Sequence, residues 1–180
     1  MELVSSTDTA RFASSWNSRR YVGYASPMPR YLRYRLDREN YLANNAVWHV
    51  TMVTAMRQAY LADPEMAQLV IDTFAFSCNR ANAELYLIVV MPDHVHAMTG
   101  GGNKGLEQLM RNIKSWTSRQ FQIPGSSRRL WQPSYNDRGV RVNEQGKALA
   151  SYILANPVRH GLCEDWTEYP WIAGSLISED

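Results

Sequence analysis

Two histidines separated by one residue are the first feature of this chain that could do chemistry. His94 and His96 flank Val95 in the stretch VVMPDHVHAMTG, residues 89–100. If this stretch is a strand, both imidazoles point to one face and Val95 points to the other. Two imidazoles at this spacing can bind one metal ion, which then needs a third ligand. A bare His-x-His pattern is also compatible with an ordinary surface pair.

A second stretch, SYILANPVRHG at residues 151–161, offers groups that would complete such a site. Tyr152 and Asn156 are four residues apart and share one face of a helix. The amide oxygen of Asn156 could be the third ligand. The phenol of Tyr152 could attack a phosphate that the metal polarises. The alternative is structural: Tyr152 packs in the core, and Asn156 only ends the helix before Pro157.

The surrounding patterns predict the elements that position these residues. Asp63 and Pro64 indicate the start of a helix. The predicted order is strand, helix, strand, strand, helix, strand and closing helix, at residues 46–54, 63–82, 83–91, 94–99, 106–121, 129–142 and 143–161, where 129–142 is a loop followed by a short strand. This α+β order predicts a ferredoxin-like, RRM-like antiparallel sheet with helices on one face and the other face free. The tail, with Trp166, Tyr169 and Trp171, should pack back on this body.

The charge distribution favours a polyanionic partner, although the formal net charge is only +2. Residues 104–141 hold eight basic residues and two acidic ones, and the N-terminal part is also rich in arginine. Solvated arginines on helix faces are the plainer alternative. Cys78 and Cys163 form no CxxC pair, and no apolar run approaches the ~20 residues of a membrane span. We therefore expect a cytoplasmic, reduced protein without a membrane partner.

The motifs MPDHVH, LWQPSYNDR and YILANPVRHGL, with a basic helix between the first two, resemble the single-tyrosine HUH transposases. They are most similar to the REP-associated tyrosine transposase branch of that family. The resemblance covers residues 29–172, so we expect one catalytic domain at 29–180 after a loosely ordered arm at 1–28. It implies that His94 and His96 are metal ligands, that Tyr152 is the nucleophile, and that Asn156 takes the third-ligand position. His49 matches a position without a catalytic role.

The family implies cleavage and rejoining of single-stranded DNA through a 5′-phosphotyrosine, with Mg²⁺ or Mn²⁺ as the cofactor. It also implies recognition of a DNA hairpin of the REP type, by a monomer or a homodimer. The residues expected to contact DNA phosphates are Arg33, Arg35, Arg111, Lys114 and Arg119. The aromatic side chains available for base stacking are Trp48, Trp116, Trp131 and Tyr135, although we expect most of them to belong to the core.

Two other classes of protein remain open on the sequence. The motifs HVT (49–51) and HVH (94–96) resemble those of two-histidine phosphoesterases, which need neither a metal nor Tyr152. The second motif lacks the hydroxyl residue of that class. A non-catalytic RNA-binding module of the same topology is the other alternative. It would normally show aromatic residues on its central strands, and the run LYLIVVM has only Tyr86.

Overall fold

The computed structural model describes residues 46–121, 129–140 and 144–177, and it confirms the predicted fold class. Every strand pair of its five-stranded sheet is antiparallel, in the order β4-β1-β3-β2-β5. The strands are β1 (Val47–Val53), β2 (Leu85–Met91), β3 (His94–Gly100), β4 (Asn136–Val140) and β5 (Ile172–Ala173). The helices are α3 (Pro64–Arg80), α4 (Leu106–Gln120), α5 (Glu144–Leu154) and α6 (Asn156–Arg159). The predicted arm, Arg33 and Arg35 lie outside the described residues, as does residue Asn143, at which the closing helix is predicted to begin.

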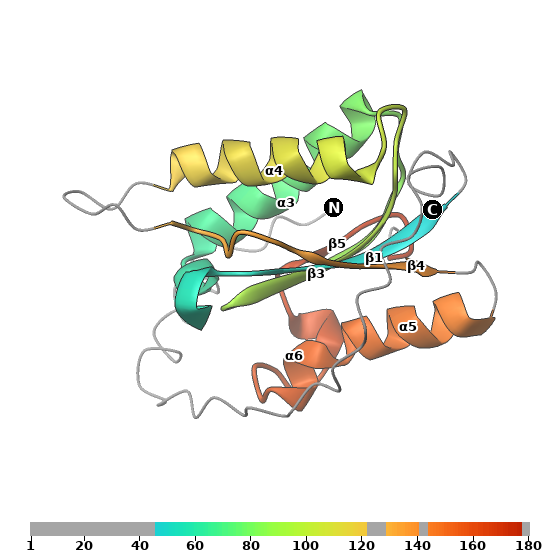
Figure 1. Cartoon of the computed structure of the whole chain (residues 1–180). Coiled ribbons are helices and arrows are strands. Elements are labelled where there is room, and N and C mark those ends of the chain that lie inside the picture. Colours follow the sequence, from blue (N-terminus) through green and yellow to red (C-terminus); the bar gives the residue numbers. More distant parts are fainter. Residues whose placement is uncertain (1–45, 122–128, 141–143, 178–180) are drawn as a thin grey trace.

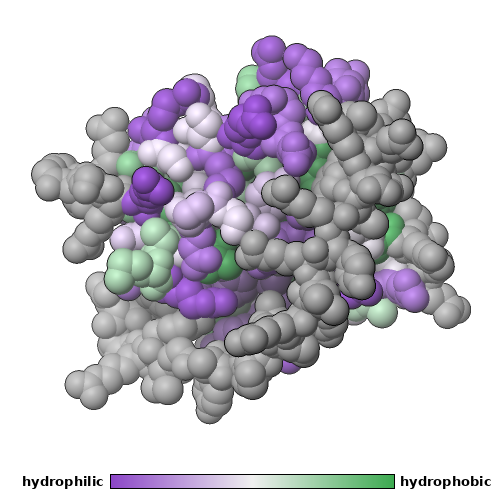
Figure 2. Space-filling view, viewed as in Figure 1, coloured by the Kyte–Doolittle hydropathy of each residue, from purple (hydrophilic) through white to green (hydrophobic). Residues whose placement is uncertain are grey.

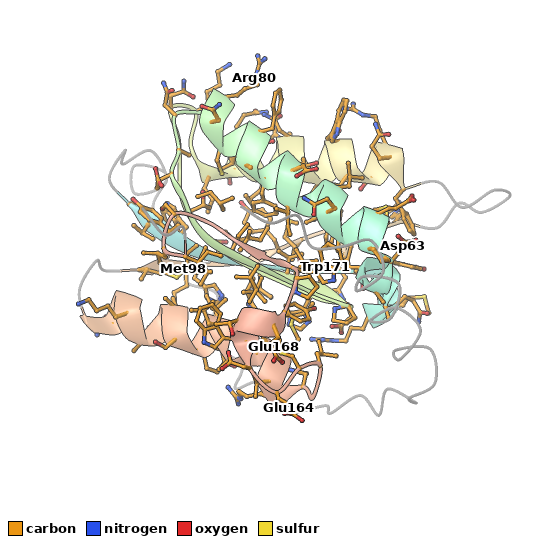
Figure 3. The ribbon with its side chains drawn as sticks, turned by 180° about the vertical axis from the view of Figure 1, so that it is seen from behind. Asp63, Arg80, Met98, Glu164, Glu168 and Trp171 are labelled. Carbon is orange, nitrogen blue, oxygen red and sulfur yellow. The ribbon has the colours of Figure 1, made fainter. Side chains whose placement is uncertain are left out.

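Helices α3 and α4 cover one face of the sheet, as the sequence predicts (Figure 1). Val50 of β1 and Val95 of β3 point into this layer, where they meet Phe74 of α3 and Ile113 of α4, and all four side chains are buried. Helix α3 begins where expected, because the Asp63 carboxylate accepts hydrogen bonds from the first backbone N–H groups of the helix. Figure 3 shows the two ends of α3 at Asp63 and Arg80.

The opposite face of the sheet is not free, so that part of the prediction is wrong. Helices α5 and α6 lie against it (Figure 1). Helix α5 contacts β2, and Ile153 is completely buried. When α5 packs on the sheet, its apolar side and the apolar sheet face are both removed from water. The packed arrangement is therefore more stable than one in which the two surfaces stay exposed. The sheet face opposite α3 and α4 is therefore covered by the segment that carries Tyr152 and Asn156.

The closing helix was predicted as one element over 143–161, but it is interrupted at Ala155. Pro157 has no N–H to donate to the carbonyl of Ile153, so the α-helical ladder cannot continue through it. The side-chain amide of Asn156 donates instead, to the carbonyls of Tyr152 (3.0 Å) and Ile153 (3.2 Å). Asn156 thus ends α5 and begins α6.

The C-terminal tail packs back on the body, as predicted. Tyr169 and Trp171 are buried, whereas Trp166 is only partly covered. The Tyr169 hydroxyl donates to the carbonyl of Val90 at 2.8 Å, and the Val90 N–H donates to the carbonyl of Trp171. Within the described residues no helix is long and apolar enough to cross a bilayer. Both cysteines, Cys78 and Cys163, are free thiols.

Candidate active site

The His-x-His pair lies on β3 as its spacing predicts. Val95 is 1% exposed on the side of α3 and α4, and the two imidazoles stand on the side of α5 and α6. The pairing of β1 with β3 places Thr51 directly opposite His96. His49, two residues before Thr51, shares the same face and is the diagonal neighbour of His96. All four histidines of the chain, His49, His94, His96 and His160, gather here.

His94 is held by a buried carboxylate. Asp93 Oδ1 lies 2.6 Å from His94 Nδ1, and Asp93 Oδ2 accepts a 3.1 Å hydrogen bond from Arg57. Burial alone would raise the pKa of Asp93, but the hydrogen bond and charge of His94, together with Arg57, hold it below its usual value. An ionised carboxylate can only accept, so Nδ1 of His94 is the donor. In neutral His94 the lone pair is therefore on Nε2, the nitrogen available to a metal.

His96 is held from the neighbouring strand. Its Nδ1 lies 3.1 Å from both His49 Nε2 and Thr51 Oγ1. Burial, followed by the charges of the other three histidines, lowers the pKa of His96 well below its usual value. Burial and the charge of Arg138 lower the pKa of His49 to about 4. His96 and His49 are consequently neutral near pH 7. For His96, this is the protonation state that a metal ligand requires.

The joint between α5 and α6 brings the second motif to the histidines. His160 Nδ1 lies 2.9 Å from the backbone oxygen of Asn156, and the ring of His160 is 6.2 Å from that of His94. Asn156 is 3% exposed. Its amide nitrogen donates to helix carbonyls, which leaves the amide oxygen as the end that could bind a cation.

Tyr152 is not a core residue, because 48% of its surface is exposed. This argues against the structural alternative, since a tyrosine that only filled the core would be buried. The guanidinium of Arg159 lies 4.9 Å from the centre of the Tyr152 ring. The phenol is therefore accessible to a substrate and has a fixed positive charge beside it, as an attack on a phosphate would need.

The histidine pair fits a divalent cation by its geometry. Two imidazoles on one ion have ring centres about 4.5–5 Å apart, for metal–nitrogen bonds of about 2 Å and bond angles of roughly 90–110°. The ring centres of His94 and His96 are 4.9 Å apart, with planes at 86°. Within the described residues, no group of three or more His, Cys, Asp or Glu side chains could hold a metal ion. A third protein ligand would then be of another type, and the sequence motif offers the amide oxygen of Asn156 for that position.

Of the residues expected to bind DNA, the three that the structure describes have different surroundings. Lys114 is half-buried, and its ammonium donates to three loop carbonyls, those of Gln132, Pro133 and Ser134, at 2.7–3.2 Å. It therefore fastens this loop to α4, a role that its charge did not reveal in the sequence. Arg111 is exposed on α4, and Arg119 lies along the outer side of α3 and α4, away from the histidines.

Of the aromatic residues considered for base stacking, two are buried and two are accessible. Trp48 and Trp131 are buried, at 1% and 3% exposure, and belong to the core. Trp131 further donates to Thr117 Oγ1 at 2.8 Å. Trp116 is 49% exposed and Tyr135 is partly covered, so these two could meet a base.

Sequence reasoning missed four residues that support the site: Asp93, Arg57, Thr51 and His160. The resemblance gives His49 no catalytic role, but in the structure His49 contacts a predicted metal ligand directly. The alternation in HVT over 49–51 was the one available signal, because it places His49 and Thr51 on the same face of a strand. The approach of β1 to His96 depends on strand register, which a single sequence does not give.

Known proteins resemble this chain in sequence and in fold. A family model for IS200-like transposases matches residues 43–156, a span that includes His94, His96, Tyr152 and Asn156. The REP-associated tyrosine transposase of Escherichia coli (strain K12) is 27% identical over 90 residues, which are 49% of this chain and 52% of that protein. The chain thus matches about half the length of this curated relative.

The solved structure of a REP-associated tyrosine transposase bound to a REP hairpin superposes on this chain with a TM-score of 0.62. The superposition covers 84% of this chain and 95% of the other, at 19% identity, and therefore speaks for the fold alone. Together with the family model, which spans well over half of the 180 residues, it confirms the resemblance drawn from the motifs. The chain belongs to the family of IS200-like transposases.

Proposed function

We propose that this protein is a metal-dependent transposase that cleaves and rejoins single-stranded DNA through a 5′-phosphotyrosine on Tyr152. The observation that carries the proposal is the shape of the histidine pair. Each imidazole has its Nδ1 engaged, His94 with Asp93 and His96 with His49 and Thr51. In the tautomer in which Nδ1 of His96 donates, as that of His94 does, both Nε2 atoms carry a lone pair for one ion, beneath the helices that carry the exposed tyrosine.

In this proposal the Tyr152 oxygen attacks the phosphorus of a phosphodiester. The bond from phosphorus to the 3′ oxygen breaks, that oxygen takes up a proton, and the 5′ phosphate stays on the tyrosine. Attack by another 3′-OH on the phosphotyrosine reverses these steps and joins two strands without ATP. The guanidinium of Arg159, beside the phenol, would bind a non-bridging phosphate oxygen and oppose the negative charge that develops there.

Mg²⁺ or Mn²⁺, when bound by His94, His96 and Asn156, would act as a Lewis acid on the scissile phosphate. The protein's own contribution is to keep His96 neutral and to orient all three ligands. Burial keeps His96 unprotonated, and Asp93 fixes the tautomer of His94. The side-chain amide of Asn156 is oriented by the end of α5. The mixture of two nitrogens and one amide oxygen suits Mn²⁺ somewhat better than Mg²⁺.

The DNA partner is proposed to be a hairpin with an adjoining single strand. Support comes from the relative whose structure contains a REP hairpin and from the basic residues outside the site. Monomer and homodimer are both compatible with this chemistry. A two-histidine phosphoesterase is less compatible, because His49 and His96 are hydrogen-bonded to each other and leave no space for a phosphate between them.

The experiment is incubation of the full chain with a labelled hairpin oligonucleotide and Mn²⁺, followed by denaturing electrophoresis to detect a protein–DNA adduct. Tyr152→Phe should abolish the adduct while hairpin binding persists, because only the nucleophilic oxygen is removed. The matched control is Tyr60→Phe, which removes a hydroxyl from a ring that packs on Phe121 at the end of α4. An adduct at wild-type level in Tyr152→Phe would refute the assignment. Undiminished cleavage in EDTA would favour the phosphoesterase.

A further inference from the structure

A second possible binding surface lies on the far side of the sheet. Helices α3 and α4 pack side by side there, and a groove of about 880 Å³ runs along their outer seam. Figure 3 shows Arg80 at the outer end of α3, on the other side of the sheet from Glu164 and Glu168. The sheet therefore separates the groove from Tyr152 and the histidines, and the proposed chemistry does not use it.

Two large aromatic side chains line this groove and are exposed. Phe76 of α3 is 63% exposed, and Trp116 of α4 is 49% exposed. Each has an arginine over its ring: Arg80 lies 5.8 Å from the centre of Phe76, and Arg119 lies 5.4 Å from the centre of Trp116. Because these rings add little to the core, their exposure requires another explanation, and flat rings beside guanidinium groups suit stacked bases.

The charge of the groove points to the same ligand. Its lining includes Arg80, Lys104 and Arg119 but only one acidic residue, Asp72, which accepts a hydrogen bond from Gln68. The remaining polar lining is rich in amides that can bond to base edges, namely Asn103, Gln108 and Asn112. The α4 side of the molecule is accordingly mainly hydrophilic (Figure 2). A net positive groove with two exposed rings is complementary to a polyanion that carries flat bases.

We infer that the α3–α4 groove binds single-stranded DNA, with bases stacked on Phe76 and Trp116 and phosphates on Arg80, Lys104 and Arg119. The inference extends the proposed function, because it gives the DNA substrate a second contact away from Tyr152. From Gly105 to Arg119 the α4 side of the groove is about 21 Å long at roughly 1.5 Å per residue. That length suits a segment on the order of four nucleotides, the lower limit for known single-strand grooves.

The test uses the full chain and a labelled oligothymidine without a hairpin, with binding followed by fluorescence anisotropy at several salt concentrations. Phe76→Ala and Trp116→Ala should each weaken binding roughly 5-fold to 150-fold, the range measured for loss of one stacked base. Trp116→Phe should restore most of the affinity, because a phenyl ring still stacks. Leu176→Ala is the control, an exposed apolar residue outside the groove.

The charge of Arg80 should affect the salt dependence of DNA binding. Arg80→Gln should lower the slope of log affinity against log salt by about 0.7, as expected for one lost phosphate contact on a single strand. Lys147→Gln, at an exposed position on α5, is the charge control. Circular dichroism checks that the variants remain folded. Affinity unchanged in the Phe76→Ala, Trp116→Ala double variant would overturn the inference.

The proposal about the groove and the proposal about Tyr152 can be tested separately. Groove variants should still form the Tyr152 adduct when a hairpin substrate is saturating, and Tyr152→Phe should still bind oligothymidine. If the groove variants bind DNA normally but lose self-association in analytical ultracentrifugation, the groove is a protein interface and the inference is wrong. If Tyr152→Phe keeps the adduct while the groove variants lose DNA binding, the proposed function fails and the groove stands.

Discussion

Replacing Asp93 with Asn should show how much the residue that holds His94 contributes to metal binding, because this variant leaves the proposed metal ligands themselves unchanged. The Asp93 side chain is 2% exposed and serves both His94, at 2.6 Å, and Arg57, at 3.1 Å. Hydrogen bonds to charged groups contribute about 1.5–3 kcal/mol each. An amide keeps one acceptor oxygen but loses the charge, so the free energy of unfolding should fall by about 2 kcal/mol. The affinity for Mn²⁺ should fall about 10- to 100-fold, because the orientation and basicity of His94 are no longer enforced.

Urea denaturation and calorimetric titration of the apoprotein with Mn²⁺ measure these two effects. Arg57→Gln is the matched control, since it removes the other end of the same network. The Arg57 side chain is 61% exposed, so its loss should cost no more than about 1 kcal/mol and leave Mn²⁺ affinity nearly unchanged. If the Asp93 and Arg57 variants behaved alike in both measurements, Asp93 would not be the group that holds His94 for the metal.

Three other perturbations test the fold around the site. His49 has a pKa of about 4 in the folded chain and an ordinary value of 6.5, so the unfolded chain binds the proton first as pH falls. The free energy of unfolding without metal should therefore drop by about 1–2 kcal/mol between about pH 7.5 and pH 5, and urea titrations should show a flatter dependence in His49→Gln. Lys114→Met should lower the free energy of unfolding by about 1–3 kcal/mol, because three loop carbonyls lose their hydrogen bonds to the ammonium. Arg111→Met should change thermal stability little, and it should instead reduce the slope of log DNA affinity against log salt by about one. Gly174→Ala should cost more than about 3 kcal/mol, because its Cβ would clash with the backbone oxygen of Tyr86. Gly161→Ala has open space and should cost only the left-handed strain of about 1–2 kcal/mol, so equal melting temperatures for the two would contradict this account.

Features that depend on near neighbours in the chain could be predicted from the sequence. The period of a strand places His94 and His96 on one face and Val95 on the other, whatever the strand pairs with. The start of α3 follows from Asp63 and Pro64, which act on the first turn of their own helix. The order of elements then restricts the fold to one sheet topology, and the motif spacing indicated the family.

The surroundings of the histidines depended on the tertiary structure. His49 meets His96 across 47 residues, and the register between β1 and β3 alone decides that contact. The covering of the histidine face, the capping of α5 by Asn156 and the fastening of a loop by Lys114 each depend on which segments pack together. Local sequence preferences contribute only tenths of a kcal/mol per residue, whereas burial of a large side chain contributes about 1.5–3 kcal/mol, so long-range packing determines these arrangements. The sequence by itself determined which residues could do the chemistry, and the tertiary structure decided which partners hold them in place.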